Sequence, residues 1–150
     1  MTIRIIAEIG INHRGSVEKA KNLIDKAVLA NCWGVKFQFR DIATFYQSTD
    51  EIGDGILLEE LQRTELSARE LEELASYARH LGIKVGLSFF RVSDLAHAMP
   101  LVSQFDFLKV PSAECTNTPL IDAMLSTGKL VMVSTGGHST DQIENALSKY

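Results

Sequence analysis

The sequence has little of what marks several specialised classes of protein. It contains only two cysteines, Cys32 and Cys115, without metal-ligand spacing, which fits a reducing compartment. Its N-terminal apolar stretch is short and is interrupted by Arg4 and Glu8, so it is neither a signal peptide nor a membrane span. Lysine and arginine number 15 against 19 acidic residues, so no basic face for nucleic acid is expected. We therefore expect a cytoplasmic protein with neither a nucleic-acid nor a membrane partner.

The chain does contain a regular alternation of strand and helix patterns. At 150 residues with 45% apolar composition, it is long enough for one domain with a sizeable core. Short apolar runs predict strands at residues 3–11, 34–39, 84–90, 107–111 and 130–134. Apolar residues at helical spacing and capping signals predict helices after Ser16, from Ser67 with Glu70, over about 93–104 with a break at Pro100, from Thr118, and from Ser139 with Gln142.

This strict alternation predicts an α/β fold with a parallel sheet and helices outside it. A five-stranded doubly wound sheet is one possible form, whereas a TIM (β/α)₈ barrel needs eight units and about 250 residues. We expect about five of the eight barrel units, with residues 1–150 as the N-terminal portion of a barrel domain and no second domain within the chain. The long connection over 40–66 is interpreted as a functional loop whose tip, at Gly53 and Gly55, can move.

Polar residues cluster at the ends of the predicted strands. They are Glu8 and Asn12, Lys36 and Gln38, Lys109, Ser112 and Glu114, and Ser134 and Thr135. The carboxyl ends of parallel strands open onto the face where α/β proteins bind ligands. Several polar strand ends facing one point therefore predict an active site.

Lys36 and Lys109 are the most informative pair. Two ammonium groups at the ends of the second and fourth predicted strands are suited to an anionic substrate that carries a carboxylate or a phosphate. Alternatively, Lys36 pairs only with Glu8 and Lys109 only with Glu114, or one lysine forms a Schiff base with a carbonyl substrate. The two glutamates are candidates for general acid or base groups, or serve only to orient the lysines.

The remaining polar segments carry weaker signals. Residues 134–137 combine two hydroxyls and two glycines, which favours close approach of the backbone to a phosphate, although a capped turn has the same composition. His13 and His138 are expected at the catalytic face, where a histidine can bind metal or substrate, and His80 and His97 on the surface. No pair of histidines has metal-binding spacing, so no metal ligand is assigned. Cys115 is expected to be a small packed residue.

With these residues in place, the chain resembles the sialic acid synthase family, which condenses phosphoenolpyruvate with an N-acetylated hexosamine. The matching motifs, in family order, are Ala7-Glu8-Ile9-Gly10-Ile11-Asn12-His13 with Gly15-Ser16, Val35-Lys36-Phe37-Gln38, Glu65-Leu66-Ser67, Lys109-Val110-Pro111-Ser112-Ala113-Glu114-Cys115 and Ser134-Thr135-Gly136. The resemblance implies a (β/α)₈ barrel followed by a small antifreeze-like domain, and a homodimer of the full-length protein.

The resemblance also implies a role for each matched residue. Lys109, Ser112 and Ser134 would contact the phosphate of phosphoenolpyruvate, and Lys36 its carboxylate. Gln38 and Glu114 would hold sugar hydroxyls, and Glu8 would lie near the attacking water. A divalent metal, Mn²⁺ or Mg²⁺, would polarise the sugar aldehyde, with ligands from later strands that are not in this chain.

Two positions depart from the family pattern. Phe89 stands where a threonine usually helps to bind the carboxylate, and His138 where a small or amide residue is usual. The altered third strand, at Phe89, indicates a variant substrate among the nonulosonic acids, such as legionaminic or pseudaminic acid. The chain alone is expected to be incomplete for catalysis and to expose apolar sheet edges. A class I (Schiff-base) aldolase and a non-catalytic binding domain made from part of a barrel remain alternatives.

Overall fold

The computed structural model describes residues 3–42 and 55–150. Its strands are β1 (Ile6–Gly10), β2 (Gly34–Gln38), β3 (Lys84–Ser88), β4 (Phe107–Val110) and β5 (Leu130–Val133). They form one sheet in the order β1-β2-β3-β4-β5, and every neighbouring pair is parallel. The predicted parallel βα architecture is therefore confirmed, and each strand lies within its predicted segment.

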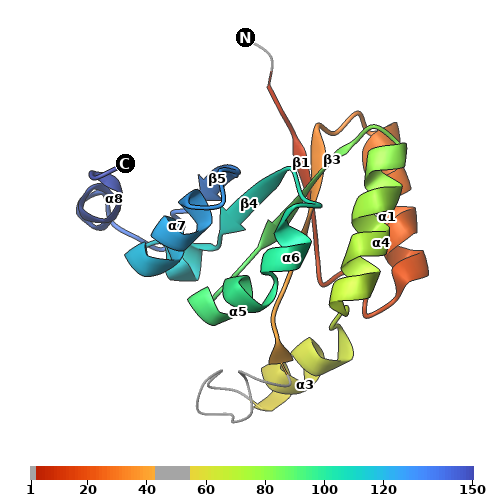
Figure 1. Ribbon diagram of the computed structural model, residues 1–150, viewed down its shortest axis with the longest axis horizontal. Coiled ribbons are helices and arrows are strands. Elements are labelled where there is room, and N and C mark those ends of the chain that lie inside the picture. The colour runs from red at the N-terminus through yellow and green to blue at the C-terminus, as the bar shows by residue number, and fades with distance from the viewer. Residues whose placement is uncertain (1–2, 43–54) are drawn as a thin grey trace.

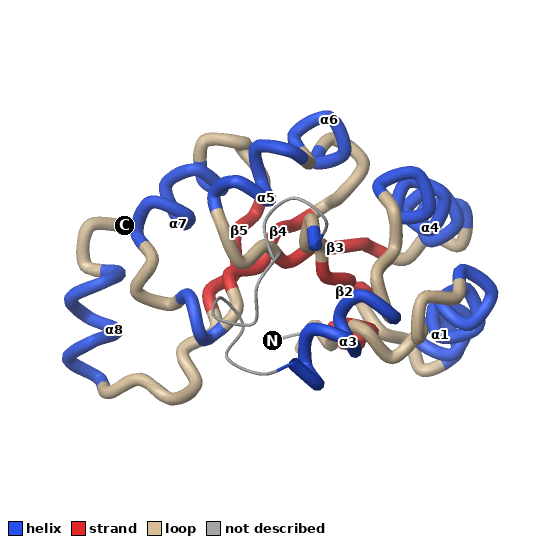
Figure 2. Tube along the Cα trace, turned by 90° about the horizontal axis from the view of Figure 1, so that it is seen from below, coloured by secondary structure: helices blue, strands red, loops and turns tan. Residues whose placement is uncertain are grey.

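The helices lie mainly on one side of this sheet. They are α1 (Val17–Leu29), α3 (Gly55–Arg63), α4 (Ala68–His80), α5 (Val92–His97), α6 (Met99–Val102), α7 (Thr118–Leu125) and α8 (Thr140–Leu147), with a short 3₁₀ turn η2 (Ser112–Glu114) after β4. Figure 2 shows the strands as an arc with α1, α4, α6 and α7 outside it. Helix α3 lies instead beyond the carboxyl end of β2 (Figure 1). The arc corresponds to part of a barrel wall.

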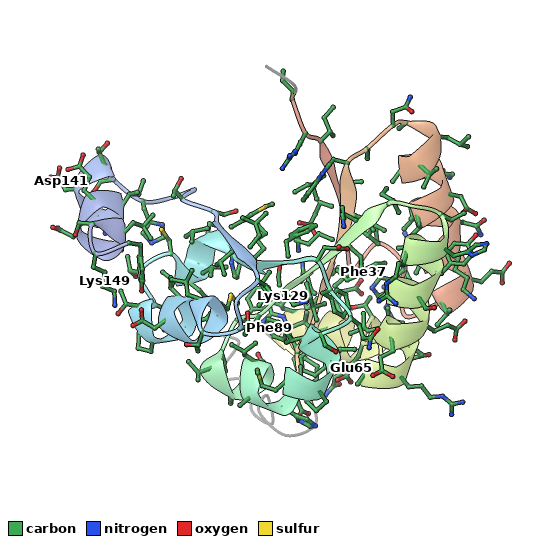
Figure 3. All side chains as sticks on the ribbon, turned by 45° about the horizontal axis from the view of Figure 1, so that its top comes forward. Phe37, Glu65, Phe89, Lys129, Asp141 and Lys149 are labelled. Atoms are coloured by element: carbon green, nitrogen blue, oxygen red, sulfur yellow. The ribbon has the colours of Figure 1, made fainter. Side chains whose placement is uncertain are left out.

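The outer face of the sheet holds the core. Side chains alternate between the two faces of a strand, and those directed at the helices are apolar and buried, among them Val35, Phe37, Leu87 and Leu108. Figure 3 labels Phe37 between the sheet and α4. Full burial of a side chain of this size stabilises the fold by about 1.5–3 kcal/mol. The core therefore fixes which side chains face the opposite way, toward the inside of the arc.

The inner face carries small and polar residues, the ring of Phe107 and, in β5, the side chains of Leu130 and Met132. Phe107 in β4 lies over Gly34 and Gly86, so closely that a Cβ added at Gly86 would overlap the ring. Trp33 packs against the same ring, with centroids 5.4 Å apart. Glycine is required here by this close approach. Phe107 thereby fills the inner face at the level of Gly34 and Gly86. The polar side chains of Ser88 and Lys109 lie closer to the carboxyl ends of the strands.

Most helix ends follow the predicted signals. Ser16 caps α1, and both predicted capping boxes, Ser67 with Glu70 and Ser139 with Gln142, are present. The cap of α7 is Asn117, not Thr118 as predicted, because the side chain of Asn117 accepts a hydrogen bond from the amide of Leu120.

The predicted helix over 93–104 is two short helices, α5 and α6, divided at Ala98. Pro100 lacks the N–H that would continue the hydrogen-bond ladder, so the predicted break is confirmed.

The long connection over 40–66 differs from its prediction as a loop, because it contains α3. Leu61 of this helix is buried against Ile42, and Leu58 packs beside them, so a small apolar cluster holds α3 in place. Gly55 is the first residue of the helix and not the tip of a loop. Gly53 lies outside the described residues. Over residues 3–42 and 55–150, no helix is both long enough and apolar enough to cross a membrane.

Candidate active site

Polar side chains form a row on the inner face of the sheet near the carboxyl ends of its strands. Glu8 in β1 is the register partner of Lys36 in β2, and Ser88 in β3 is the register partner of Lys109 in β4. Because register partners in a parallel sheet point to the same face, both predicted lysines lie on the inner face. They come from different strands but face the same space.

Lys36 is almost fully buried, with 2% of its side chain exposed. Its ammonium lies 2.8 Å from Glu8 Oε1 and donates to Ser88 Oγ at 2.6 Å and to the carbonyl oxygen of Phe37 at 3.2 Å. Burial lowers the pKa of Lys36 from its ordinary 10.5 to about 8, because the charged form loses water; Glu8 opposes this effect and Lys109 adds to it. Lys36 therefore carries its charge at neutral pH but loses it within reach of mildly alkaline conditions.

Lys109 is half-buried, and its charge contributes to the lowered pKa of Lys36, so the two ammonium groups lie within electrostatic range. It makes no ion pair within the described part of the chain. Glu114, the acid predicted as its alternative partner, accepts a hydrogen bond from Asn117 Nδ2 at 2.8 Å instead. The pairing of each lysine with a neighbouring acid thus occurs for Lys36 with Glu8 and is wrong for Lys109 with Glu114.

The turns that follow β4 and β5 lie next to each other. The amide of Ser134 donates to the carbonyl of Val110 at 3.0 Å, and a Cβ added at Gly136 would be 3.8 Å from Ser112 Cβ. Ser112 and the turn that begins at Ser134 and Thr135 therefore share the edge of the sheet beyond Lys109. The structure brings these three predicted residues together, although no described contact joins their hydroxyls.

Gly10 allows Glu8 and Gln38 to approach each other. Its φ is +54°, and a Cβ added there would be 3.2 Å from both Gln38 Nε2 and Glu8 Oε1. The pairing of β1 with β2 also shifts between Glu8 and Gly10. Asn12 is exposed in the turn before α1 and lines an open depression with Glu8 and residues of that helix, and a second one with α1 residues alone. The structure therefore brings Gln38 beside Glu8, and gives Asn12 no described contact with either lysine.

The two histidines predicted at the catalytic face have different surroundings. His13 is 2% exposed, and its Nδ1 accepts a hydrogen bond from the amide of Gly15 at 3.1 Å. Burial lowers the pKa of His13, which favours a neutral ring that holds this turn. His138 is half-buried, with Nδ1 3.3 Å from the carbonyl oxygen of Gly136. His97 is exposed as predicted, yet its Nδ1 is hydrogen-bonded to Asp41 Oδ2.

Residues 3–42 and 55–150 contain no group of three or more His, Cys, Asp or Glu side chains that could hold a metal ion. These residues therefore do not fit the divalent metal that the resemblance implies. The ammonium groups of Lys36 and Lys109 on the inner face are suited to binding an anion. Cys115 is fully buried and free, as its prediction as a packed residue requires.

Sequence reasoning missed three contributors to this region. Ser88 and Gly10 support the lysine and glutamate described above, and alternation along β3 is the signal by which Ser88 was detectable. The third is Glu65, at the junction of α3 and α4 (Figure 3), which accepts a hydrogen bond from the amide of Ile42 at 3.3 Å. Burial raises the pKa of Glu65. It lines a pocket together with Gln38 and Leu61 of α3, and neither lysine lines this pocket.

Comparison with known proteins identifies the family to which this chain is similar. The sequence model of the NeuB family matches residues 23–150. The chain is 31% identical over 96% of its length to N,N'-diacetyllegionaminic acid synthase of Campylobacter jejuni, and 29% identical over 95% to N-acetylneuraminate-9-phosphate synthase of Drosophila melanogaster. It spans 45% and 40% of those proteins, less than half of each.

Solved structures of similar proteins support the same family and fold. N-acetylneuraminic acid synthetase of Leptospira borgpetersenii, at 28% identity, matches 99% of this chain with a TM-score of 0.83, and the chain covers 50% of it. A truncated 3-deoxy-D-arabino-heptulosonate 7-phosphate synthase of Thermotoga maritima matches with a TM-score of 0.64 at 13% identity, which shows the fold alone. The family match and the shared barrel architecture together establish that this chain belongs to the NeuB family, with its five βα units forming part of a TIM barrel.

Proposed function

We propose that the protein condenses phosphoenolpyruvate with an N-acetylated hexosamine, N-acetylmannosamine or a related sugar, to form a sialic or other nonulosonic acid with release of phosphate. Membership of the NeuB family supports this reaction, as do relatives that are synthases of legionaminic acid and of N-acetylneuraminate 9-phosphate. Because the chain spans less than half of those relatives, the activity is proposed for the whole protein. Within it, residues 1–150 are proposed as the N-terminal portion of the barrel.

The observation that carries the proposal is the placement of Lys36 and Lys109 on one face within electrostatic range. Holding two like charges together lowers the stability of the protein, and an anion between them relieves the repulsion. Phosphoenolpyruvate carries a carboxylate and a phosphate ester on the same carbon, C2. We assign the carboxylate to Lys36 and the phosphate to Lys109, at the edge shared with Ser112 and Ser134.

The other predicted residues take roles around the sugar. Gln38 and Glu114 are proposed to hold its hydroxyls, and Asn12 and Thr135 to contribute at the rim of the site. The side chains of Glu8 and Gln38 both lie close to Gly10. Glu8 is proposed to orient the water that completes the reaction. Each of these groups binds or positions a reactant.

The proposed reaction forms one carbon–carbon bond and breaks one carbon–oxygen bond. C3 of phosphoenolpyruvate bonds to the aldehyde carbon of the open-chain sugar, whose oxygen takes a proton and becomes a hydroxyl. C2 then carries cationic character, and water adds there and loses a proton. The bond between C2 and the phosphate oxygen then breaks, phosphate leaves, and the new hydroxyl at C2 loses its proton to become the ketone. Fixed cationic groups around the phosphate stabilise the charge that develops on it.

Three further features of the proposal concern the whole protein. A divalent metal, Mn²⁺ or Mg²⁺, is proposed with ligands from outside the described residues, so no role given above depends on it. A homodimer and a cytoplasmic location, both expected from the sequence, stay predictions. The departure at Phe89 is the basis for proposing a variant sugar, and Phe89 is fully buried beside the ring of Phe39.

Release of phosphate from phosphoenolpyruvate and N-acetylmannosamine tests the proposal. Lys109→Ala is expected to weaken the use of phosphoenolpyruvate about 10- to 100-fold, since a hydrogen bond between charged groups contributes about 1.5–3 kcal/mol. Lys21→Ala is the matched control, because Lys21 pairs with Glu73 on the outer helices. Unchanged activity in the Lys109 variant contradicts the proposal.

One observation favours a second candidate, a Schiff-base aldolase. The pKa of Lys36 is lowered to about 8, and a buried lysine with a depressed pKa is the usual nucleophile of such enzymes. Borohydride reduction in the presence of pyruvate or phosphoenolpyruvate separates the two. The condensation predicts no lysine adduct by mass spectrometry, whereas the aldolase predicts an adduct that Lys36→Met removes.

A further inference from the structure

The ammonium of Lys36 has no donor left for a ligand. An ammonium group carries three N–H donors. Three acceptors surround the Nζ atom: Glu8 Oε1 at 2.8 Å, Ser88 Oγ at 2.6 Å and the carbonyl oxygen of Phe37 at 3.2 Å. Lys109, by contrast, has no ion pair or side-chain hydrogen bond recorded across residues 3–42 and 55–150. A carboxylate can therefore reach Lys109 directly, but reaches Lys36 only if one of its acceptors leaves.

Only one of the three acceptors is able to leave without disturbing the sheet. Ser88 is 1% exposed and lies in β3, where its position is set by pairing with both neighbouring strands. The carbonyl of Phe37 belongs to β2 itself. The side chain of Glu8 is 51% exposed, whereas that of Lys36 is 2% exposed, so Glu8 is the partner in this ion pair with room to move. Glu8 is therefore the exchangeable partner.

We infer that Glu8 is a displaceable cover on Lys36, and that an anionic substrate binds by placing its own carboxylate where the Glu8 carboxylate now lies. The inference rests on the proposed function for its ligand, phosphoenolpyruvate. Ser88 acts as a positioning residue that keeps the ammonium aimed at the inner face throughout the exchange.

Exchange suits a buried cation better than an open site does. A buried charge left without a partner is strongly destabilising, at several kcal/mol. With Glu8 in place, Lys36 is paired before the ligand arrives, and with the ligand in place it is paired again. Nζ donates the same number of hydrogen bonds before and after the exchange. The ammonium is therefore paired in both the free and the bound protein. The displaced carboxylate of Glu8 then lies beside the ligand, where a water can be held.

The test is the affinity of the intact protein for phosphoenolpyruvate, measured by isothermal titration calorimetry. Glu8→Gln removes the competing charge and keeps the size of the side chain, so binding is expected to tighten about tenfold, which corresponds to about 1.4 kcal/mol. In a Lys36→Met background the same change is expected to alter affinity less than twofold. Glu18→Gln, at an exposed acid on α1, is the charge control and is expected to leave affinity unchanged.

The outcomes separate the inference from the proposed function. Tighter binding of Glu8→Gln that depends on Lys36 supports displacement. Equal tightening in the Lys36→Met background means that the general field of Glu8 acts, and it overturns the inference. The inference is also overturned if Glu8→Gln binds phosphoenolpyruvate no more tightly than the wild type does. If Lys36→Met still lowers the affinity in that case, the proposed function stands. No binding to any variant overturns both. Glu8→Ala is the second variant, and circular dichroism confirms folding of each.

Discussion

Replacing Lys36 by methionine is expected to stabilise the fold while it removes anion binding. The pKa of Lys36 falls from 10.5 to about 8 in the folded protein. Each pKa unit corresponds to about 1.36 kcal/mol, so the folded state disfavours the ammonium by about 3 kcal/mol at neutral pH. Methionine has a similar unbranched shape without the charge. Loss of the hydrogen bond to Ser88 costs about 1 kcal/mol, so we expect a net stabilisation of about 2 kcal/mol at pH 7.

The pH dependence gives this prediction its sign. Between pH about 8 and 10.5 the unfolded chain holds a proton on Lys36 that the folded protein has lost. Stability rises with pH wherever the unfolded state binds more protons. The wild-type protein therefore gains stability relative to Lys36→Met across this window. Below pH 8 the full penalty is present, and above pH 10.5 it is absent.

Urea unfolding of both proteins at pH 7 and at pH 10.5, followed by circular dichroism, measures this difference. The advantage of Lys36→Met at pH 7 is expected to shrink by about 3 kcal/mol at the higher pH. Using the difference between the two proteins cancels the titration of other groups. A difference that does not change with pH, or a variant less stable than the wild type at pH 7, refutes the description of Lys36 as a penalised buried cation.

Three further predictions concern the scaffold of the site. Gly86→Ala is expected to destabilise the protein by about 1–3 kcal/mol in thermal unfolding, because the new methyl group overlaps the ring of Phe107; an unchanged melting temperature contradicts this packing. Ser67→Ala, which removes one half of a capping box, is expected to cost about 1 kcal/mol in urea unfolding with substrate binding unchanged. Gly10→Ala is expected to cost about 1–2 kcal/mol from its positive φ and to weaken phosphoenolpyruvate binding by crowding Glu8, so a loss of stability alone would argue against its role at the site.

The sequence was sufficient for the order and type of the main elements. Short apolar runs and capping residues such as Ser67 depend on local chemistry, which the sequence carries directly. Placing Lys36 and Lys109 at the ends of parallel strands was enough to predict one shared face, because the parallel arrangement fixes which ends meet. The two lysines do lie on that face.

The features that sequence reasoning did not find depend on contacts between distant segments. Helix α3 was interpreted as part of a loop although Leu57, Leu58 and Leu61 have helical spacing; its position beside the sheet depends on packing of Leu61 against Ile42, which lies far away in the sequence. Alternation along β3 predicts which face Ser88 is on, but its hydrogen bond with Lys36 depends on the register of β2 with β3. Pairing of Lys109 with Glu114 was offered from nearness in sequence, whereas the turn η2 directs Glu114 toward Asn117.

A crystal structure of the protein with phosphoenolpyruvate tests the central claim most directly, namely that Lys36 and Lys109 hold one small dianionic ligand on the inner face of the sheet. We expect the ligand carboxylate on Lys36 in place of Glu8, and the phosphate on Lys109 beside Ser112 and Ser134. A ligand bound elsewhere, or one bound here with no contact to either ammonium group, contradicts the account.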